Sequence, residues 1–194
     1  MPKVDRVTIS TNQLVDVRNV ATVRSNHYVG SLVIPSGKGL TNWAGWLLNY
    51  DEPITLIADN QEQADVAARD MATIGLDVVS DWTLADDLDQ SRFETFMTTT
   101  CQELDGSEVV LDVRGINEWN NVHLASSLHI PLGYLRGRLN ELPRDKKIVV
   151  HCASGGRSPI AVSILKQAGF ENIAEIGGGI TDISLRCPMN VVTA

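Results

Sequence analysis

The chain has 194 residues, of which 43% are hydrophobic and 21% are charged, and its net charge is −8. This composition is typical of a globular protein and excludes disordered, collagen-like and coiled-coil chains. No apolar run approaches the roughly 18 residues of a membrane-spanning helix, and no signal peptide is recognisable at the N-terminus. The acidic balance argues against a nucleic-acid partner, so neither a nucleic acid nor a membrane is expected to bind this chain.

Two segments of the chain repeat one another. Residues 15–18 match residues 111–114, and residues 27–35 match residues 123–131, both at an offset of 96 positions. Residues 54–57 then match residues 148–151, and Gly75 matches Gly169, at an offset of 94 positions. Several matches in the same order indicate a duplicated domain rather than two unrelated strands that share a short motif. We therefore predict one domain at residues 1–85 and a second at residues 86–194.

Strands and helices alternate within the first copy. Residues 56–58 are predicted to form a buried strand, and residues 64–74 an amphipathic helix that Gly75 terminates. The joining segment, residues 83–106, carries apolar side chains at helical spacing, and we predict a helix there that packs on the second copy.

The second copy follows the same plan. Strands are predicted at residues 109–113, 148–151 and 173–176, and a helix at residues 159–168 that ends at Gly169. Alternation of strand and helix indicates an α/β fold in which a parallel sheet is flanked by helices. The sequence therefore predicts two domains, each built on a small parallel sheet.

The segment between the strand at 148–151 and the following helix is the strongest candidate for chemistry. Ligands of parallel sheets bind at the carboxyl ends of the strands. The small residues of this segment allow several backbone N–H groups to converge into an anion-binding nest next to a helix N-terminus. The helix dipole and Arg157 favour the thiolate of Cys152, which is therefore the predicted nucleophile. The alternative is a buried core cysteine. The candidate residues are Cys152, Ala153, Ser154, Gly155, Gly156, Arg157 and Ser158.

Several motifs of the second copy together resemble a rhodanese domain, and the resemblance extends, in degraded form, to the first copy. They are Asp112-Val113-Arg114, Glu118-Trp119, His123, Ile130-Pro131 and the loop 152–158. The resemblance implies a sulfurtransferase with Cys152 as the catalytic residue and residues 153–158 as the substrate-binding loop. The related phosphatases have Cys-x5-Arg, whereas this loop has Cys-x4-Arg, which favours sulfur over phosphate. A cysteine phosphatase or arsenate reductase and a non-enzymatic persulfide-carrier or docking module are the alternatives.

Residues 37–48 resemble one particular group of proteins that contain rhodanese domains. They look like the first rhodanese-like domain of bacterial fusions in which a metallo-β-lactamase-fold persulfide dioxygenase precedes two rhodanese domains. This resemblance implies that the chain is a piece of a longer protein or a stand-alone relative, and that an upstream dioxygenase domain is a candidate partner. The four histidines of this chain show no metal-ligand motif, and no metal and no cofactor are expected.

The first copy serves as an internal comparison. At an offset of 94 positions, Ala58 takes the place of Cys152 and Gln63 that of Arg157. The loop also gains two carboxylates, Asp59 and Glu62, which would repel an anionic donor. We therefore expect the first copy to be catalytically inactive, and to serve either as a docking surface or as a structural wall.

The expected reaction is a two-step relay, as the resemblance implies. Cys152 would accept sulfane sulfur from thiosulfate or a low-molecular-weight persulfide and pass it to sulfite, cyanide or a thiol. Arg157 would bind the donor or, alternatively, clamp a carboxylate such as Asp112. Ser154 and Ser158 would hydrogen-bond the thiolate, and Ser158 also suits a helix cap.

The remaining polar residues are assigned structural roles. Asp112 and Arg114 recur in the inactive copy and are predicted to form a structural ion pair, and His123 recurs as His27. His151 is a weaker candidate base because neighbouring side chains of a strand point to opposite faces. Five basic residues are assigned to a solvated face rather than to a donor-binding rim: Arg136, Arg138, Arg144, Lys146 and Lys147.

The cysteines do not have the spacing of a metal site, and three of them cannot all pair. Reduced thiols and a cytoplasmic location are therefore expected. Cys101 is expected to be inert. Cys187 could resolve a Cys152 persulfide as a disulfide if the C-terminal tail folded back.

Overall fold

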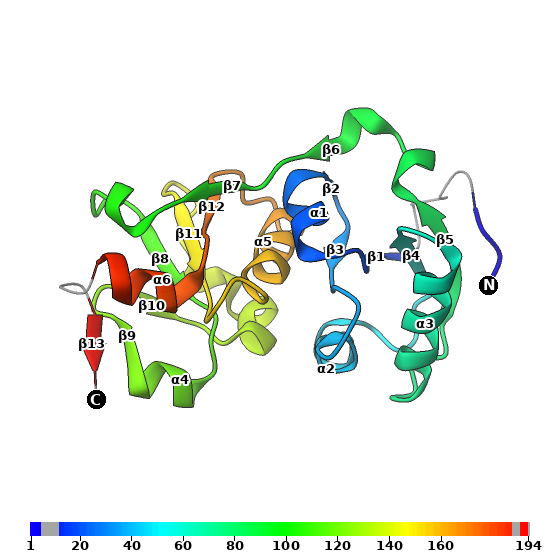
Figure 1. Cartoon of the computed structure of the whole chain (residues 1–194), viewed down its shortest axis with the longest axis horizontal. Helices are drawn as coiled ribbons and strands as arrows, with labels where there is room; N and C mark the ends of the chain where they lie inside the picture. The colour runs from blue at the N-terminus through cyan, green and yellow to red at the C-terminus, as the bar shows by residue number, and fades with distance from the viewer. Residues whose placement is uncertain (5–11, 188–190, 194) are drawn as a thin grey trace. The chain divides into compact units, whose positions relative to one another are not determined.

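The computed structural model describes residues 1–4, 12–187 and 191–193. The chain divides into two compact units, residues 1–95 and residues 96–194, which Figure 1 shows as a ribbon. Across the described residues, no helix is long and apolar enough to span a membrane. The cytoplasmic location stays a prediction.

The first unit is built on a four-stranded parallel sheet with the strand order β3-β1-β4-β5. Its strands are β1 (Gln13–Asp16), β3 (Leu32–Val33), β4 (Ile54–Ala58) and β5 (Val79–Leu84). Every residue of β4 is buried, as expected for a central strand covered on both faces. The predicted strand at residues 56–58 lies within β4.

Three helices accompany this sheet: α1 (Val20–Ser25), α2 (Leu40–Leu47) and α3 (Gln61–Ala72). A short strand, β2 (His27–Tyr28), pairs in antiparallel fashion with β6 (Phe93–Glu94). Helix α3 begins three residues before the predicted start at residue 64, because the Asn60 side chain caps it by accepting the Gln63 N–H. Gly75 follows with φ at +83°, the left-handed conformation expected of a helix terminator.

The second unit contains a five-stranded parallel sheet with the order β10-β8-β11-β12-β7. Strands β11 (Ile148–His151) and β12 (Ile173–Ile176) have the predicted bounds, and β8 (Val109–Asp112) is one residue shorter than predicted. The edges are β10 (Leu128–His129) and β7 (Met97–Thr99). The predicted helix is α5 (Ser158–Gln167), and Gly169 after it has φ at +78°.

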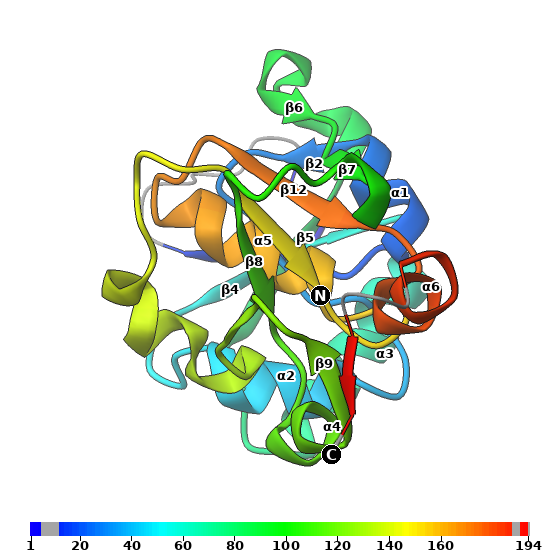
Figure 2. The ribbon, with the colours of Figure 1, turned by 90° about the vertical axis from the view of Figure 1, so that its left-hand side faces the viewer.

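Helices α5 and α6 (Gly179–Arg186) lie on opposite faces of this sheet, as Figure 2 shows. The face under α6 holds an apolar cluster of Cys101, Val110, Leu124, Val149, Ile176, Ile180 and Ile183. The unit also contains α4 (Ile116–Asn121), a 3₁₀ segment at Leu132–Glu141, and β9 (Val122–Leu124), which pairs with β13 (Val191–Thr193). The carboxyl ends of β8, β11 and β12 therefore lie between the two helical layers.

The two sheets share one strand order. β3-β1-β4-β5 of the first unit corresponds in sequence to β10-β8-β11-β12 of the second. The strand starts Gln13 and Val109 lie 96 positions apart, and Ile54 and Ile148 lie 94 apart, the offsets seen in the sequence. The internal repeat thus coincides with a repeated strand topology.

The prediction of a helix at residues 83–106 is wrong. This segment contains the end of β5, the 3₁₀ turns Ala85–Asp87, Gln90–Arg92 and Cys101–Glu103, and strands β6 and β7. Its backbone hydrogen bonds go to partner strands instead, since β6 pairs with β2 and β7 with β12. The apolar spacing that suggested a helix arises because Phe93 packs on Tyr28 of the first unit, whereas Phe96 is buried in the second.

The expectation of three reduced thiols is also wrong. Cys101 and Cys187 form a disulfide, with their Cα atoms 6.3 Å apart. The 3₁₀ turn that follows β7 brings Cys101 against the end of α6, a proximity that no sequence spacing reveals. Cys101 is therefore not an idle thiol, and Cys187 is already paired with Cys101 rather than available to Cys152. Cys152 itself is free and buried.

Candidate active site

Cys152 lies directly after β11, at the carboxyl edge of the sheet. Its side chain is only 1% exposed. The backbone around it is held by α6, since the Ile180 N–H donates to the Cys152 carbonyl oxygen at 2.8 Å. The cysteine thus occupies the position at which parallel sheets bind ligands.

The loop that follows curls around the sulfur. Gly155 adopts φ at +89°, a conformation that favours glycine, and its N–H donates to Cys152 Sγ at 3.1 Å. Gly155 and Ser158 are buried, Ala153 and Arg157 are half-buried, and Ser154 and Gly156 are exposed. Residues 152–157 therefore form one loop, in which a backbone donor is directed at the sulfur, and Ser158 begins α5.

Ser158 and Ser154 differ in their relation to the sulfur. Ser158 Oγ lies 3.8 Å from Cys152 Sγ, whereas the Ser154 side chain is exposed. The predicted capping role of Ser158 is wrong, because Ser158 is the first residue of α5 and its hydroxyl donates to Glu175 Oε2 at 2.8 Å. Glu175, on β12, is completely buried. Glu175 is not among the site residues predicted from the sequence, although a glutamate within an otherwise apolar strand is a recognisable signal.

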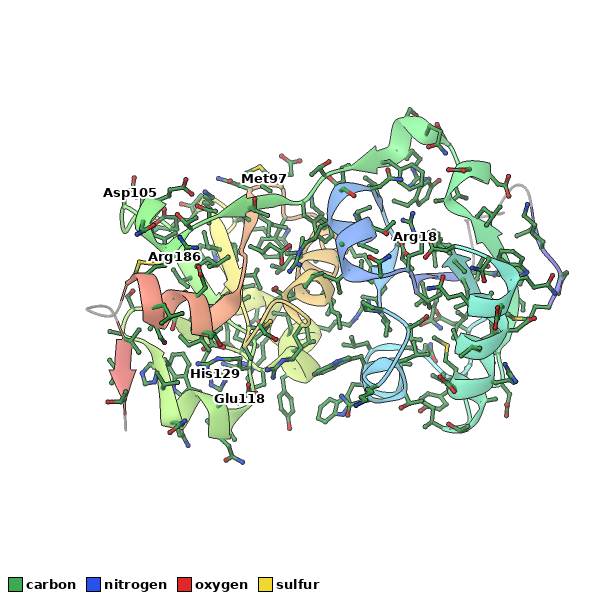
Figure 3. The ribbon with its side chains drawn as sticks, viewed as in Figure 1. Arg18, Met97, Asp105, Glu118, His129 and Arg186 are labelled. Atoms are coloured by element: carbon green, nitrogen blue, oxygen red, sulfur yellow. A yellow bond between two sulfur atoms is a disulfide. The ribbon has the colours of Figure 1, made fainter. Side chains whose placement is uncertain are left out.

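Arg157 is engaged by a carboxylate. Its Nη1 and Nη2 donate to the two oxygens of Glu118 on α4, each at 2.6 Å. Figure 3 labels Glu118, together with His129 on β10. The Arg157 guanidinium lowers the pKa of the Glu118 carboxyl, and the same hydrogen bonds raise the pKa of Arg157. Arg157 therefore clamps a carboxylate, as one of the two predicted roles required, but the carboxylate is Glu118 and not Asp112.

Asp112 and Arg114 form the predicted ion pair. Arg114 Nη2 donates to Asp112 Oδ2 at 2.6 Å, and both side chains are buried. Arg18 and Asp16 make the same contact at the same distance in the first unit. Each arginine also donates to a backbone carbonyl eight residues further on. The pair therefore supports the strand-to-helix turn in both units, as predicted.

The histidines of the second unit serve the local structure. His151 is completely buried, its Nδ1 lies 3.4 Å from the Cys152 carbonyl oxygen and its Nε2 3.6 Å from Asp112 Oδ2, and burial lowers its pKa. Trp119 stacks between the rings of His123 and His129, with centroid distances of 3.9 and 4.6 Å. Among the residues that the structure describes, no group of acidic, histidine and cysteine side chains is arranged to hold a metal ion.

Three of the five basic residues predicted to form a solvated face make contacts away from the loop. Arg136 donates to Gln167, Arg138 to Glu141 and Arg144 to the Ala168 carbonyl. The solvated face itself stays a prediction.

Gly179 is a second residue of the site that was not predicted from the sequence. It has φ at +60°, and a Cβ atom there would overlap the carbonyl oxygens of Cys152 and Ala153. Only a glycine allows α6 to approach the loop so closely. Gly177, Gly178 and Gly179 follow one another in the sequence, but nothing in this run indicates contact with Cys152.

The corresponding loop of the first unit is shorter. Helix α3 starts at Gln61, three residues after the end of β4, whereas α5 starts seven residues after β11. Gln63 fills the turn, accepting the Asp59 N–H and donating to the Val17 carbonyl. At the position that corresponds to the Cys152 loop, the first unit therefore has an ordinary helix start, which Asn60 and Gln63 cap.

Comparisons with known proteins relate the second unit of the chain to a protein family. A rhodanese-like domain model matches residues 99–185. A sulfurtransferase of Allochromatium vinosum is 33% identical over 81 residues, which are 41% of this chain and 76% of that protein. YrkF of Bacillus subtilis, provisionally named a sulfur carrier protein, is 37% identical over 83 residues, 42% of this chain and 45% of its own.

A rhodanese-related protein of Thermoplasma volcanium has a crystal structure with 38% identity and a TM-score of 0.45, covering 50% of this chain and 98% of that one. The chain spans less than half the length of the first curated relatives that it matches. The residues that the family model matches include Cys152. Through this rhodanese-like domain, the chain belongs to the rhodanese family.

Proposed function

We propose that this protein is a sulfurtransferase that carries sulfane sulfur on Cys152. The observation that carries the proposal is the Gly155 N–H directed at Cys152 Sγ within a loop at the carboxyl edge of a parallel sheet. Backbone donors placed at a reacting atom stabilise negative charge that develops there. The family and the printed name of the Allochromatium relative support the same class of reaction.

The reaction has two steps. The Cys152 thiolate attacks the outer sulfur of thiosulfate, a new S–S bond forms, and sulfite leaves with the electron pair of the broken bond. With a low-molecular-weight persulfide as donor, a thiolate leaves instead. An acceptor such as sulfite, cyanide or a thiol then attacks the outer sulfur of the Cys152 persulfide and releases the Cys152 thiolate. In this reaction residues 153–158 are the substrate-binding loop, and Arg157 attracts an anionic donor.

A persulfide carrier is the second candidate. Its support is the burial of Cys152, which would shelter a bound persulfide, together with the name of YrkF. We further propose that residues 1–85 are a degenerate rhodanese-like copy without a nucleophile, and that an upstream dioxygenase domain is a partner. The shortened loop at Asn60 supports the lack of activity in this copy.

Mass measurement of the intact protein tests the function. The purified protein is treated briefly with thiosulfate or with glutathione persulfide, beside Cys152→Ser. We expect wild type to gain one sulfur atom that cyanide removes, and Cys152→Ser, which retains Cys101 and Cys187, to gain none. A wild type that gains no sulfur from either donor would overturn the proposal. Multiple turnovers to cyanide would indicate the enzyme, and a single loading without turnover the carrier.

A further inference from the structure

A buried carboxylate stands one hydroxyl group behind the Cys152 sulfur. Glu175 is completely buried on β12, and its Oε2 accepts the hydroxyl hydrogen of Ser158 at 2.8 Å. Ser158 Oγ in turn lies 3.8 Å from Cys152 Sγ. The three side chains come from three segments, namely the end of β11, the start of α5 and the middle of β12.

The direction of the Ser158 hydroxyl follows from this arrangement. A serine has one hydroxyl hydrogen to donate, and Ser158 donates it to Glu175 Oε2. Because the hydrogen of Ser158 points to Glu175, the side of its oxygen that faces Cys152 presents lone pairs. That oxygen can accept a hydrogen bond from a protonated Cys152 thiol, whereas it cannot donate one to a thiolate.

From this geometry we infer that Glu175 is a positioning residue, which orients Ser158 as a hydrogen-bond acceptor and so favours the thiol form of Cys152 over the thiolate. The Gly155 N–H acts in the opposite sense, because a hydrogen-bond donor stabilises the thiolate, and Arg157, although paired with Glu118, adds a weaker attraction. Glu175 therefore sets how far these groups shift the balance toward thiolate. The inference rests on the proposed role of Cys152 as the sulfur-carrying nucleophile.

The other charged groups near the site largely compensate one another. Arg114 is paired with Asp112 on β8, Arg157 with Glu118 on α4, and Asp182 with Arg186 on α6. Burial lowers the pKa of His151 on β11 and so favours its neutral form. Glu175 differs from these groups because it is linked to the sulfur by a single hydroxyl.

The consequence concerns both steps of the relay. A destabilised thiolate is the stronger nucleophile, and it is the poorer leaving group when the persulfide is unloaded. Glu175 would therefore prolong the life of the loaded state. Glu175 would also protect the resting protein from oxidation at Cys152, because oxidants attack the thiolate and the resting thiol is protonated.

A pH titration of the Cys152 thiolate tests the inference. The ultraviolet absorbance of the thiolate is followed under non-reducing conditions, and Cys152→Ser supplies the blank. We expect Glu175→Gln, whose amide N–H can donate to the Ser158 oxygen and free the Ser158 hydrogen for the sulfur, to shift the midpoint to lower pH by about one unit. Such a shift is a tenfold rise in the thiolate-to-thiol ratio at a given pH below the midpoint. Glu175→Asp, which retains the charge, should titrate nearer to wild type than to Glu175→Gln.

Ser158→Ala tests whether the effect of Glu175 on Cys152 passes through the Ser158 hydroxyl. Removing the acceptor oxygen should lower the midpoint, and Glu175→Gln added to Ser158→Ala should then cause a smaller shift than it does alone. An unchanged or higher midpoint in Glu175→Gln would overturn the inference, even if the variant were less stable. Should Glu175→Gln fail to fold, an unchanged or higher midpoint in Ser158→Ala would overturn it instead. The titration uses no sulfur donor, so a failure of sulfur loading in wild type does not affect its outcome.

Discussion

Arg157 donates two hydrogen bonds of 2.6 Å to the two carboxylate oxygens of Glu118, which ties the Cys152 loop to α4. The Glu118 side chain is 39% exposed, so water screens the pair. We expect Glu118→Gln to lower the free energy of unfolding by at most about 1 kcal/mol. Urea unfolding measures this change, and Glu141→Gln, which breaks the exposed pair with Arg138, is the matched control. A loss of several kcal/mol would show that the pair contributes far more than its exposure suggests.

Gly179 and Gly177 form a second matched pair. We expect Gly179→Ala to destabilise the second unit by about 2 kcal/mol or more, because the methyl group would meet the Cys152 and Ala153 carbonyls in a backbone conformation that favours glycine. A Cβ at Gly177 meets no atom within 4 Å, so Gly177→Ala should have a much smaller effect. Thermal unfolding compares the two variants. Equal melting temperatures would contradict the close packing of α6 on the loop.

The disulfide between Cys101 and Cys187 closes a loop with a sequence separation of 86. Loop-closure entropy sets its stabilisation at up to about 4–5 kcal/mol. We therefore expect a reductant to lower the melting temperature of wild type and of Cys152→Ser alike. The double variant Cys101→Ser/Cys187→Ser should melt lower from the start and be insensitive to reductant. If mass analysis showed full reduction and the melting temperature were unchanged, the disulfide would have no stabilising role.

His27 and His151 make the stability depend on pH. Both are buried, and burial lowers the pKa of each below its ordinary value of 6.5. The unfolded chain therefore binds protons that the folded chain does not, and stability is lost as the pH falls from about 6.5 toward the lower folded values. We expect the free energy of unfolding to decrease between about pH 7 and about pH 5, and His27→Gln to weaken that decrease. Stability that stayed flat or rose on acidification would contradict this expectation.

Much of the fold could be predicted from local patterns. Short runs rich in apolar residues marked β11 and β12 to the residue, because strands buried on both faces are mostly apolar, even though β11 ends in His151 and β12 includes Glu175. Gly75 and Gly169 marked two helix ends, because the left-handed conformation there favours glycine. The spacing of apolar residues gave a wrong prediction for the segment 83–106. Its apolar residues pack into two different units, and periodicity assumes that they share one face.

The amino-acid order alone identified the repeat, the α/β alternation, the buried ion pairs of both units and the loop around Cys152. Each of these depends on residues that are neighbours in sequence or recur at a constant offset. The disulfide of Cys101, the carboxylate partner of Arg157, the fit of Gly179 and the hydroxyl link from Glu175 to Cys152 emerged from the folded chain. These contacts join residues on different strands and helices, and their proximity is set by the packing of the layers, which a linear pattern does not encode.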